Sequence, residues 1–106
     1  MDGAERGIEL SADDVTIAGF EFDEANIGHM AAHGLEPNIV WDVWADEPIL
    51  VPRAGRSGTH LMIGQESSGR VWSIAVLLVD DEFDIWRPIT GWLSTRKEQR
   101  TWRGGR

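Results

Sequence analysis

The stretch FEFDEANIGHMAAHGLEP, residues 20–37, specifies its secondary structure more clearly than any other part of the chain. Two phenylalanines alternate with a glutamate at its start, which predicts a short strand. Asp23 then stands at a favourable helix N-cap position, and Gly34 stands where a left-handed residue would end the helix. We therefore expect a helix over residues 24–34. Its inward stripe should consist of its spaced apolar residues, Ile27, Met30 and Ala31.

A second helix and then a series of strands are expected after this stretch. Pro37 can open a helix that Pro48 closes, and apolar residues recur between them at helical spacing. The hydrophobic period then changes to two, which is typical of strands. Glycine and acidic turns separate four such segments, at residues 48–54, 59–67, 70–79 and 83–90. A last helix is expected to begin near Thr95.

This order of elements predicts an α+β domain. We expect the helices of residues 24–34 and 37–46 to cover one face of a four- to five-stranded antiparallel sheet, followed by the C-terminal helix. Val71–Val79 is apolar on both faces, which predicts a central strand that is covered on each side. Pro88 cannot donate a ladder hydrogen bond, so it indicates an edge position or a bulge.

Length and composition favour one domain without covalent cross-links. The chain has 106 residues and no cysteine, which excludes disulfides and thiolate metal sites. Residues 1–18 are acidic and lack a strong period, so we expect a flexible extension before a domain at residues 19–106. No apolar run is long enough for a membrane span, and the first residues lack the pattern of a secretion signal. We therefore expect a cytoplasmic protein.

The net charge of −8 is unevenly distributed. Residues 1–50 hold twelve acidic residues and one arginine, whereas residues 51–106 hold six acidic residues and nine lysines or arginines. An acidic chain is not a general nucleic-acid binder, because phosphate contacts require a cationic face. The C-terminal part could still supply such a face locally.

Several phrases, in order and spacing, resemble the BrnT-type toxins of the RelE-like ribonuclease toxin group. They are FEFDEAN at 20–26, His29, HGL at 33–35, VWADEP at 43–48, IG at 63–64, GRV at 69–71 and RPITGWLSTRKEQR at 87–100. The match covers roughly residues 20–102. Two positions depart from the family pattern: Trp92 replaces an arginine near the end of the last strand, and an acidic turn at residues 80–82 replaces another.

The resemblance implies the toxin of a type II toxin–antitoxin pair, an endoribonuclease that needs no metal or cofactor. Its partners would be RNA and a ribbon–helix–helix antitoxin of the BrnA kind, and a homodimer within the complex stays open. The positions that match the active C-terminal stretch are Arg87, Arg96, Lys97 and Glu98 as catalytic residues, with Arg100 and Trp92 in contact with substrate. The two departures leave open whether the chain is an active enzyme.

Each of these residues also has a purely structural interpretation. Thr95 and Glu98 have the spacing of a capping box, so Glu98 could be a cap or a catalytic group. Arg96 and Lys97 could bind an anion together with helix N–H groups, or be solvated charges, as could Arg100. Arg87 could reach a phosphate or pair with Asp84. Our hypothesis is that a turn brings Arg87 beside Arg96 and Lys97 around one phosphate.

Histidines and tryptophans were candidates for two other kinds of site. His29 and His33 have a spacing compatible with zinc, but there is no cysteine and no nearby third ligand. A helix-packing or capping role for His33, beside Gly34, is favoured. Trp72 and Trp86 could stack on bases, although core packing is favoured. The competing functions are a non-catalytic partner-binding module of the same fold and, less favoured, a phosphate- or nucleotide-binding regulator.

Overall fold

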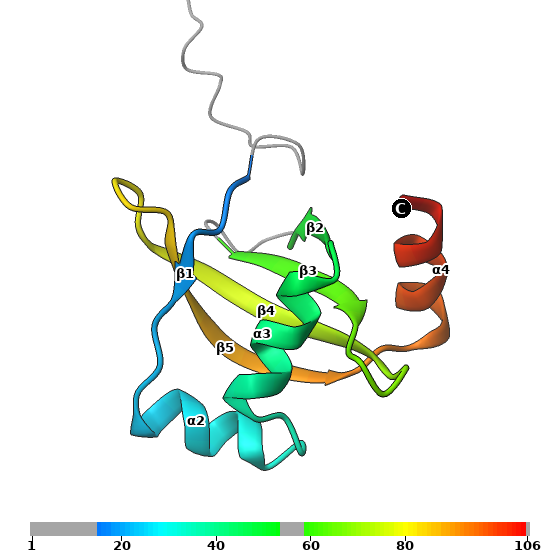
Figure 1. Cartoon of the computed structure of the whole chain (residues 1–106), viewed down its shortest axis with the longest axis horizontal. Coiled ribbons are helices and arrows are strands. Elements are labelled where there is room, and N and C mark those ends of the chain that lie inside the picture. The colour runs from blue at the N-terminus through cyan, green and yellow to red at the C-terminus, as the bar shows by residue number, and fades with distance from the viewer. Residues whose placement is uncertain (1–14, 54–58, 106) are drawn as a thin grey trace, which may run out of the picture.

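The computed structural model describes residues 15–53 and 59–105, which form three helices and five strands in an α+β arrangement (Figure 1). The strands are β1 (Gly19–Phe20), β2 (Ile49–Pro52), β3 (Thr59–Gln65), β4 (Val71–Asp80) and β5 (Ile85–Leu93). The helices are α2 (Glu24–Ala31), α3 (Pro37–Ala45) and α4 (Arg96–Gly105). The predicted α+β class is confirmed. None of the described helices is long and apolar enough to cross a membrane.

The sheet is mixed, and the prediction of a wholly antiparallel sheet is wrong. Its strand order is β1-β5-β4-β3-β2. The last four strands of the chain pair antiparallel, but β1 pairs with β5 in parallel, with Gly19 opposite Ile85 and Phe20 opposite Trp86. Two helices separate β1 from the other strands, so no hairpin sets its direction. Alternation in the sequence indicates that a strand forms but carries no information about the direction of its partner.

β4 lies at the centre of the sheet, as its apolar sequence predicts. Five consecutive residues of β4 are buried: Trp72, Ser73, Ile74, Ala75 and Val76. Because successive side chains of a strand point to opposite faces, both faces of β4 are covered. On one face Ile74 and Val76 share a core with residues of α2 and α3, among them Met30 and Val40.

Pro88 lies at a bulge, beyond the two residues of β5 that pair with β1. β5 lies between β1 and β4, and its register with β4 shifts between Ala75, which faces Thr90, and Val76, which faces Pro88. Ile89 is therefore the extra residue. The register shift confirms the bulge alternative.

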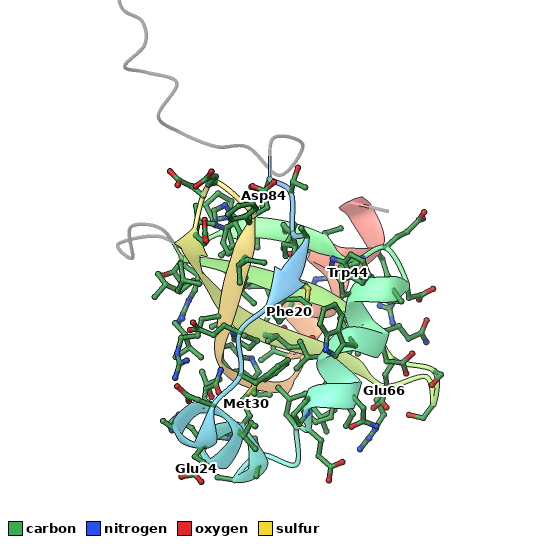
Figure 2. The ribbon with its side chains drawn as sticks, turned by 60° about the vertical axis from the view of Figure 1, so that its left-hand side comes forward. Phe20, Glu24, Met30, Trp44, Glu66 and Asp84 are labelled. Atoms are coloured by element: carbon green, nitrogen blue, oxygen red, sulfur yellow. The ribbon has the colours of Figure 1, made fainter. Side chains whose placement is uncertain are left out.

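Helix α2 begins as predicted but presents a different face to the sheet. Asp23 caps it, and Gly34 has a left-handed φ of 78°, although the helix itself ends at Ala31. Met30 is fully buried where α2 meets the sheet (Figure 2), whereas Ile27 is 38% exposed. Asn26 is buried in its place, because its amide binds backbone carbonyls of neighbouring segments. These polar contacts fix the rotation of the helix.

Most of the expected N-terminal extension, residues 1–14, lies outside the described residues. The last four residues of the expected extension, residues 15–18, are described. Among them, Ile17 is buried in the core and Val15 packs against the core. Ala18 donates its N–H to the carbonyl of Asp84 at 2.8 Å. The packed part of the chain therefore begins before β1.

Candidate functional site

Helix α4 begins with the predicted capping box. The Thr95 hydroxyl accepts the N–H of Glu98 at 3.1 Å, and the Glu98 carboxylate accepts the N–H of Thr95 at 2.9 Å. Two of the N–H groups that a helix start leaves unpaired are thereby satisfied. The capping interpretation of Glu98 is confirmed.

The same carboxylate joins α4 to the sheet. Glu98 Oε1 accepts the hydroxyl of Ser73 on β4 at 2.9 Å and the indole N–H of Trp92 on β5 at 3.0 Å. The Ser73 and Ser94 hydroxyl oxygens are 2.7 Å apart. Because Ser73 donates its only hydroxyl proton to Glu98, Ser94 donates to Ser73. One oxygen of Glu98 thus connects three segments of the fold.

These contacts determine the ionisation of Glu98. Burial alone would raise its pKa, but the Thr95 N–H, Ser73 and Trp92 donate to the carboxylate and bring the pKa below its ordinary value. A general base works best when its pKa lies near the operating pH. The geometry therefore favours an anchor that is ionised at neutral pH over a proton acceptor in catalysis.

The side chain of Trp92 on β5 is directed toward Glu98. Its indole is half-buried and donates to both carboxylate oxygens, at 3.0 and 3.4 Å. An arginine at this position would place a guanidinium beside the same carboxylate. Tryptophan retains one donor there and removes the positive charge.

The outward side of α4 carries the cations. We call Arg96, Lys97, Arg100 and Arg103 the cationic face of α4; all four are exposed. Within the part of the chain that the structure describes, no carboxylate lies within 4.0 Å of their side-chain nitrogens. Arg103 donates to the neutral Gln99 amide at 3.3 Å. This face can therefore accept external anions without first breaking an ion pair.

Arg87 lies elsewhere and already has partners. Its guanidinium binds Glu21 at 3.1 Å and Asp23 at 2.9 Å, and not Asp84. The hydrogen bond from Arg87 is the main cause that lowers the pKa of Asp23 to about 2, and the two carboxylates raise the pKa of Arg87. β5 continues from Arg87 through Leu93, six residues that span roughly 20 Å. Arg87 thus does not join Arg96 and Lys97 around one phosphate.

The histidines do not gather into a metal site. Among the described residues, no three His, Asp or Glu side chains are placed to hold an ion. His29 on α2 and His33, two residues beyond its end, are both exposed, with ring centroids 6.2 Å apart, so the helix-packing alternative for His33 is wrong. His60 is buried edge-on against Trp86, and neither ring nitrogen has a hydrogen-bond partner. Burial lowers the pKa of His60 and keeps it neutral.

Trp72 and Trp86 are both buried, which confirms the core interpretation of these residues. The indole of Trp72 donates to Glu66 at 2.7 Å, and Arg70 binds the same carboxylate at 2.6 Å. Glu66 also lines an open pocket of about 450 Å³ between α3 and the β3–β4 turn. The pocket is acidic, because Asp42 and Asp46 line it as well. Glu66 is one of the structural residues that sequence reasoning missed.

Sequence reasoning also missed Ser73, Ser94 and Asn26. A serine within an otherwise apolar central strand was the available signal for Ser73, since a buried hydroxyl needs a partner. Asn26 belongs to the phrase FEFDEAN at residues 20–26, but nothing in the sequence linked it to β5.

No family model matches the chain, and no curated protein matches it.

Proposed function

We propose that this protein is a BrnT-like toxin of a type II toxin–antitoxin pair that acts in the cytoplasm and contacts RNA through the cationic face of α4. The proposal includes a RelE-like arrangement, in which α2 and α3 lie on one face of the sheet and α4 follows the last strand. It rests on the sequence resemblance together with one structural observation, the exposed cations of α4, which have no carboxylate partner among the described residues.

The charge distribution carries the argument for RNA. In a chain of net charge −8, the four cations of α4 stand together, exposed and without carboxylate partners in the described structure. Arg96 and Lys97 lie in the first turn, where the helix dipole disfavours cations by about 0.3–1 kcal/mol. An anion bound at this end offsets that cost, because its charge interacts favourably with both the side chains and the free N–H groups.

The roles of the residues follow from their positions. Arg96 and Lys97 would neutralise charge at a scissile phosphate, and Arg100 would bind the neighbouring backbone. Glu98 would hold the start of α4 so that these cations keep their places. Arg87, bound by two carboxylates, would stabilise the β1–α2 connection and take no part in the chemistry. Cleavage through a 2′-hydroxyl also needs a base, and Glu98 is poorly suited to that role.

Neutralising the first two cations should weaken RNA binding. The variant Arg96→Gln with Lys97→Gln is expected to bind short single-stranded RNA about tenfold more weakly at low salt. The slope of log K against log salt should fall by about 1.4, the value for two lost phosphate contacts on a single strand. Fluorescence anisotropy over a salt series measures both quantities.

Arg53→Gln is the matched control, because it removes one cation from β2's end and leaves α4 intact. It should bind RNA as the wild type does. Equal weakening in Arg53→Gln, or an unchanged salt slope in the α4 variant, would count against the proposed interface.

A second candidate function is a non-catalytic partner-binding module of the same fold. It is favoured by the hydrogen bonds that saturate Glu98 and by the replacement of the family arginine with Trp92. The two candidates share partner binding and differ in whether RNA is cut.

Restoring an arginine should decide between them. If the chain is a weakened enzyme, Trp92→Arg should cut RNA faster and arrest growth more strongly than the wild type when either is induced without an antitoxin. Leu93→Arg is the matched control, since it adds the same charge at the next position of β5, on the opposite face of the strand. Failure of both wild type and Trp92→Arg to cut RNA would leave the binding module.

A further inference from the structure

Four aromatic side chains form a contiguous surface on β1, the segment after it, and α3. We call Phe20, Phe22, Trp41 and Trp44 the aromatic surface. Phe20 stacks edge-on against Trp41 with centroids 4.8 Å apart, and lies 6.3 Å from Phe22. Trp41 lies 5.7 Å from Trp44. Figure 2 shows Phe20 at β1 and Trp44 on α3.

The tryptophans of this surface are open to solvent. Trp41 is 38% and Trp44 is 37% exposed, whereas Val40 and Val43 on the inward side of α3 are fully buried. A helix on the surface of a monomer normally has a polar outward side. Single exposed apolar residues are ordinary, but a contiguous aromatic patch marks an interaction site.

The segment of the chain that carries the aromatic surface is strongly acidic. Residues 15–52 contain seven acidic residues and no lysine or arginine. Among them, only Glu21 and Asp23 form ion pairs within the described residues, both with Arg87. The others are Glu24, Glu36, Asp42, Asp46 and Glu47. Asp42 directly follows Trp41, and Asp46 and Glu47 follow the end of α3.

This charge excludes several occupants. A nucleic acid or an anionic membrane would be repelled, although aromatic rings alone could stack on bases. A second copy would bring the same acidic segment to the contact. The chain's own residues 1–14 contain five acidic residues and one arginine, so they do not complement the surface either.

We propose that the aromatic surface docks a basic amphipathic helix of another protein. Its apolar side chains would cover Trp41 and Trp44, and its lysines and arginines would face the carboxylates around them. An arginine could also stack on an exposed indole. The docking does not require RNA binding. The identification of this partner with the antitoxin rests on the proposed function.

The test uses two synthetic amphipathic helical peptides that carry leucines at the same positions. The charged positions are arginine in one peptide and glutamate in the other. Calorimetry should show that the purified chain binds the arginine peptide, more weakly as salt rises, and does not bind the glutamate peptide. Trp41→Ser with Trp44→Ser should weaken the binding more than about tenfold, because buried tryptophans dominate such contacts.

Phe83→Ser is the matched control. Phe83 is 62% exposed beside the acidic residues 80–82, yet it stands apart from the aromatic surface. It should leave the affinity unchanged. Equal losses of affinity in Phe83→Ser and in the tryptophan variant would show that the aromatic surface has no special role and would overturn the proposal, as would no binding by the wild type.

Two further variants keep the result interpretable. Asp46→Lys with Glu47→Lys leaves the aromatic surface in place, so it tests the proposal even if the tryptophan variant misfolds. This variant should also bind the arginine peptide more weakly than the wild type does. The α4 variant Arg96→Gln with Lys97→Gln should bind this peptide as the wild type does, which separates the docking from the RNA interface. Self-association that disappears in the tryptophan variant would instead assign the surface to a homodimer and overturn the proposal.

Discussion

Glu98→Ala should lower the free energy of unfolding by about 3 kcal/mol. The substitution removes the cap of α4, worth about 0.5–2 kcal/mol, and the charge-assisted hydrogen bonds from Ser73 and Trp92. Ser73 is fully buried, so its hydroxyl is left without its acceptor. Urea unfolding followed by tryptophan fluorescence measures the loss.

Glu98→Gln is the matched variant. The glutamine oxygen can take the place of Oε1, which accepts all three short hydrogen bonds, so the expected loss is about 1 kcal/mol or less. If the chain cuts RNA, loss of cleavage in this folded variant would assign chemistry to Glu98. Similar stabilities for Glu98→Ala and the wild type would contradict the anchoring role.

The wild type and Glu98→Gln should respond differently to acid. The folded-state pKa of Glu98 lies below its ordinary value of 4.5. Ionised Glu98 therefore contributes stability that is present above the unfolded pKa and is lost as pH falls through the folded pKa. Glu98→Gln lacks this contribution. The difference in free energy of unfolding between the wild type and Glu98→Gln should therefore shrink as pH falls below 4.5.

Asn26→Ala is expected to cost a similar amount, about 3 kcal/mol. The Asn26 amide oxygen accepts the Asp23 N–H at 2.8 Å, and its amide nitrogen donates to the carbonyls of Glu21 at 3.0 Å and Pro88 at 2.8 Å. Asn26 is buried, and alanine would leave the Pro88 carbonyl without this donor at a buried position. The fixed rotation of α2 against β5 would also be lost.

Asn38→Ala, at an exposed position of α3, is the control and should change the stability by less than about 0.5 kcal/mol. Asn26→Asp offers a sharper test. At neutral pH a carboxylate would face the Glu21 and Pro88 carbonyls, whereas the protonated acid can donate to one of them. The difference in free energy of unfolding between Asn26→Asp and the wild type should therefore become smaller as pH falls. A deficit that stays constant with pH would argue against these hydrogen bonds.

Local features were predictable because they depend on residues a few positions apart. The Asp23 cap and the box between Thr95 and Glu98 follow from short spacings, because each is a hydrogen bond within a few residues. The central position of β4 follows from its run of apolar residues, which needs cover on both faces. The bulge at Pro88 was one of two alternatives that the missing N–H of proline left open. The α+β class follows from the change of hydrophobic period in the same way.

The tertiary structure alone decided which of these elements meet. Arg87 binds Glu21 and Asp23, which lie 66 and 64 residues away, and Asn26 binds Pro88, which lies 62 residues away. The parallel pairing of β1 and the contacts of Ser73 and Trp92 with Glu98 likewise join different elements. A single sequence states the residue types but not the register or direction in which distant strands pair. The contacts between distant elements decided that Arg87 lies away from α4, that Ile27 faces outward and that two tryptophans of α3 are exposed.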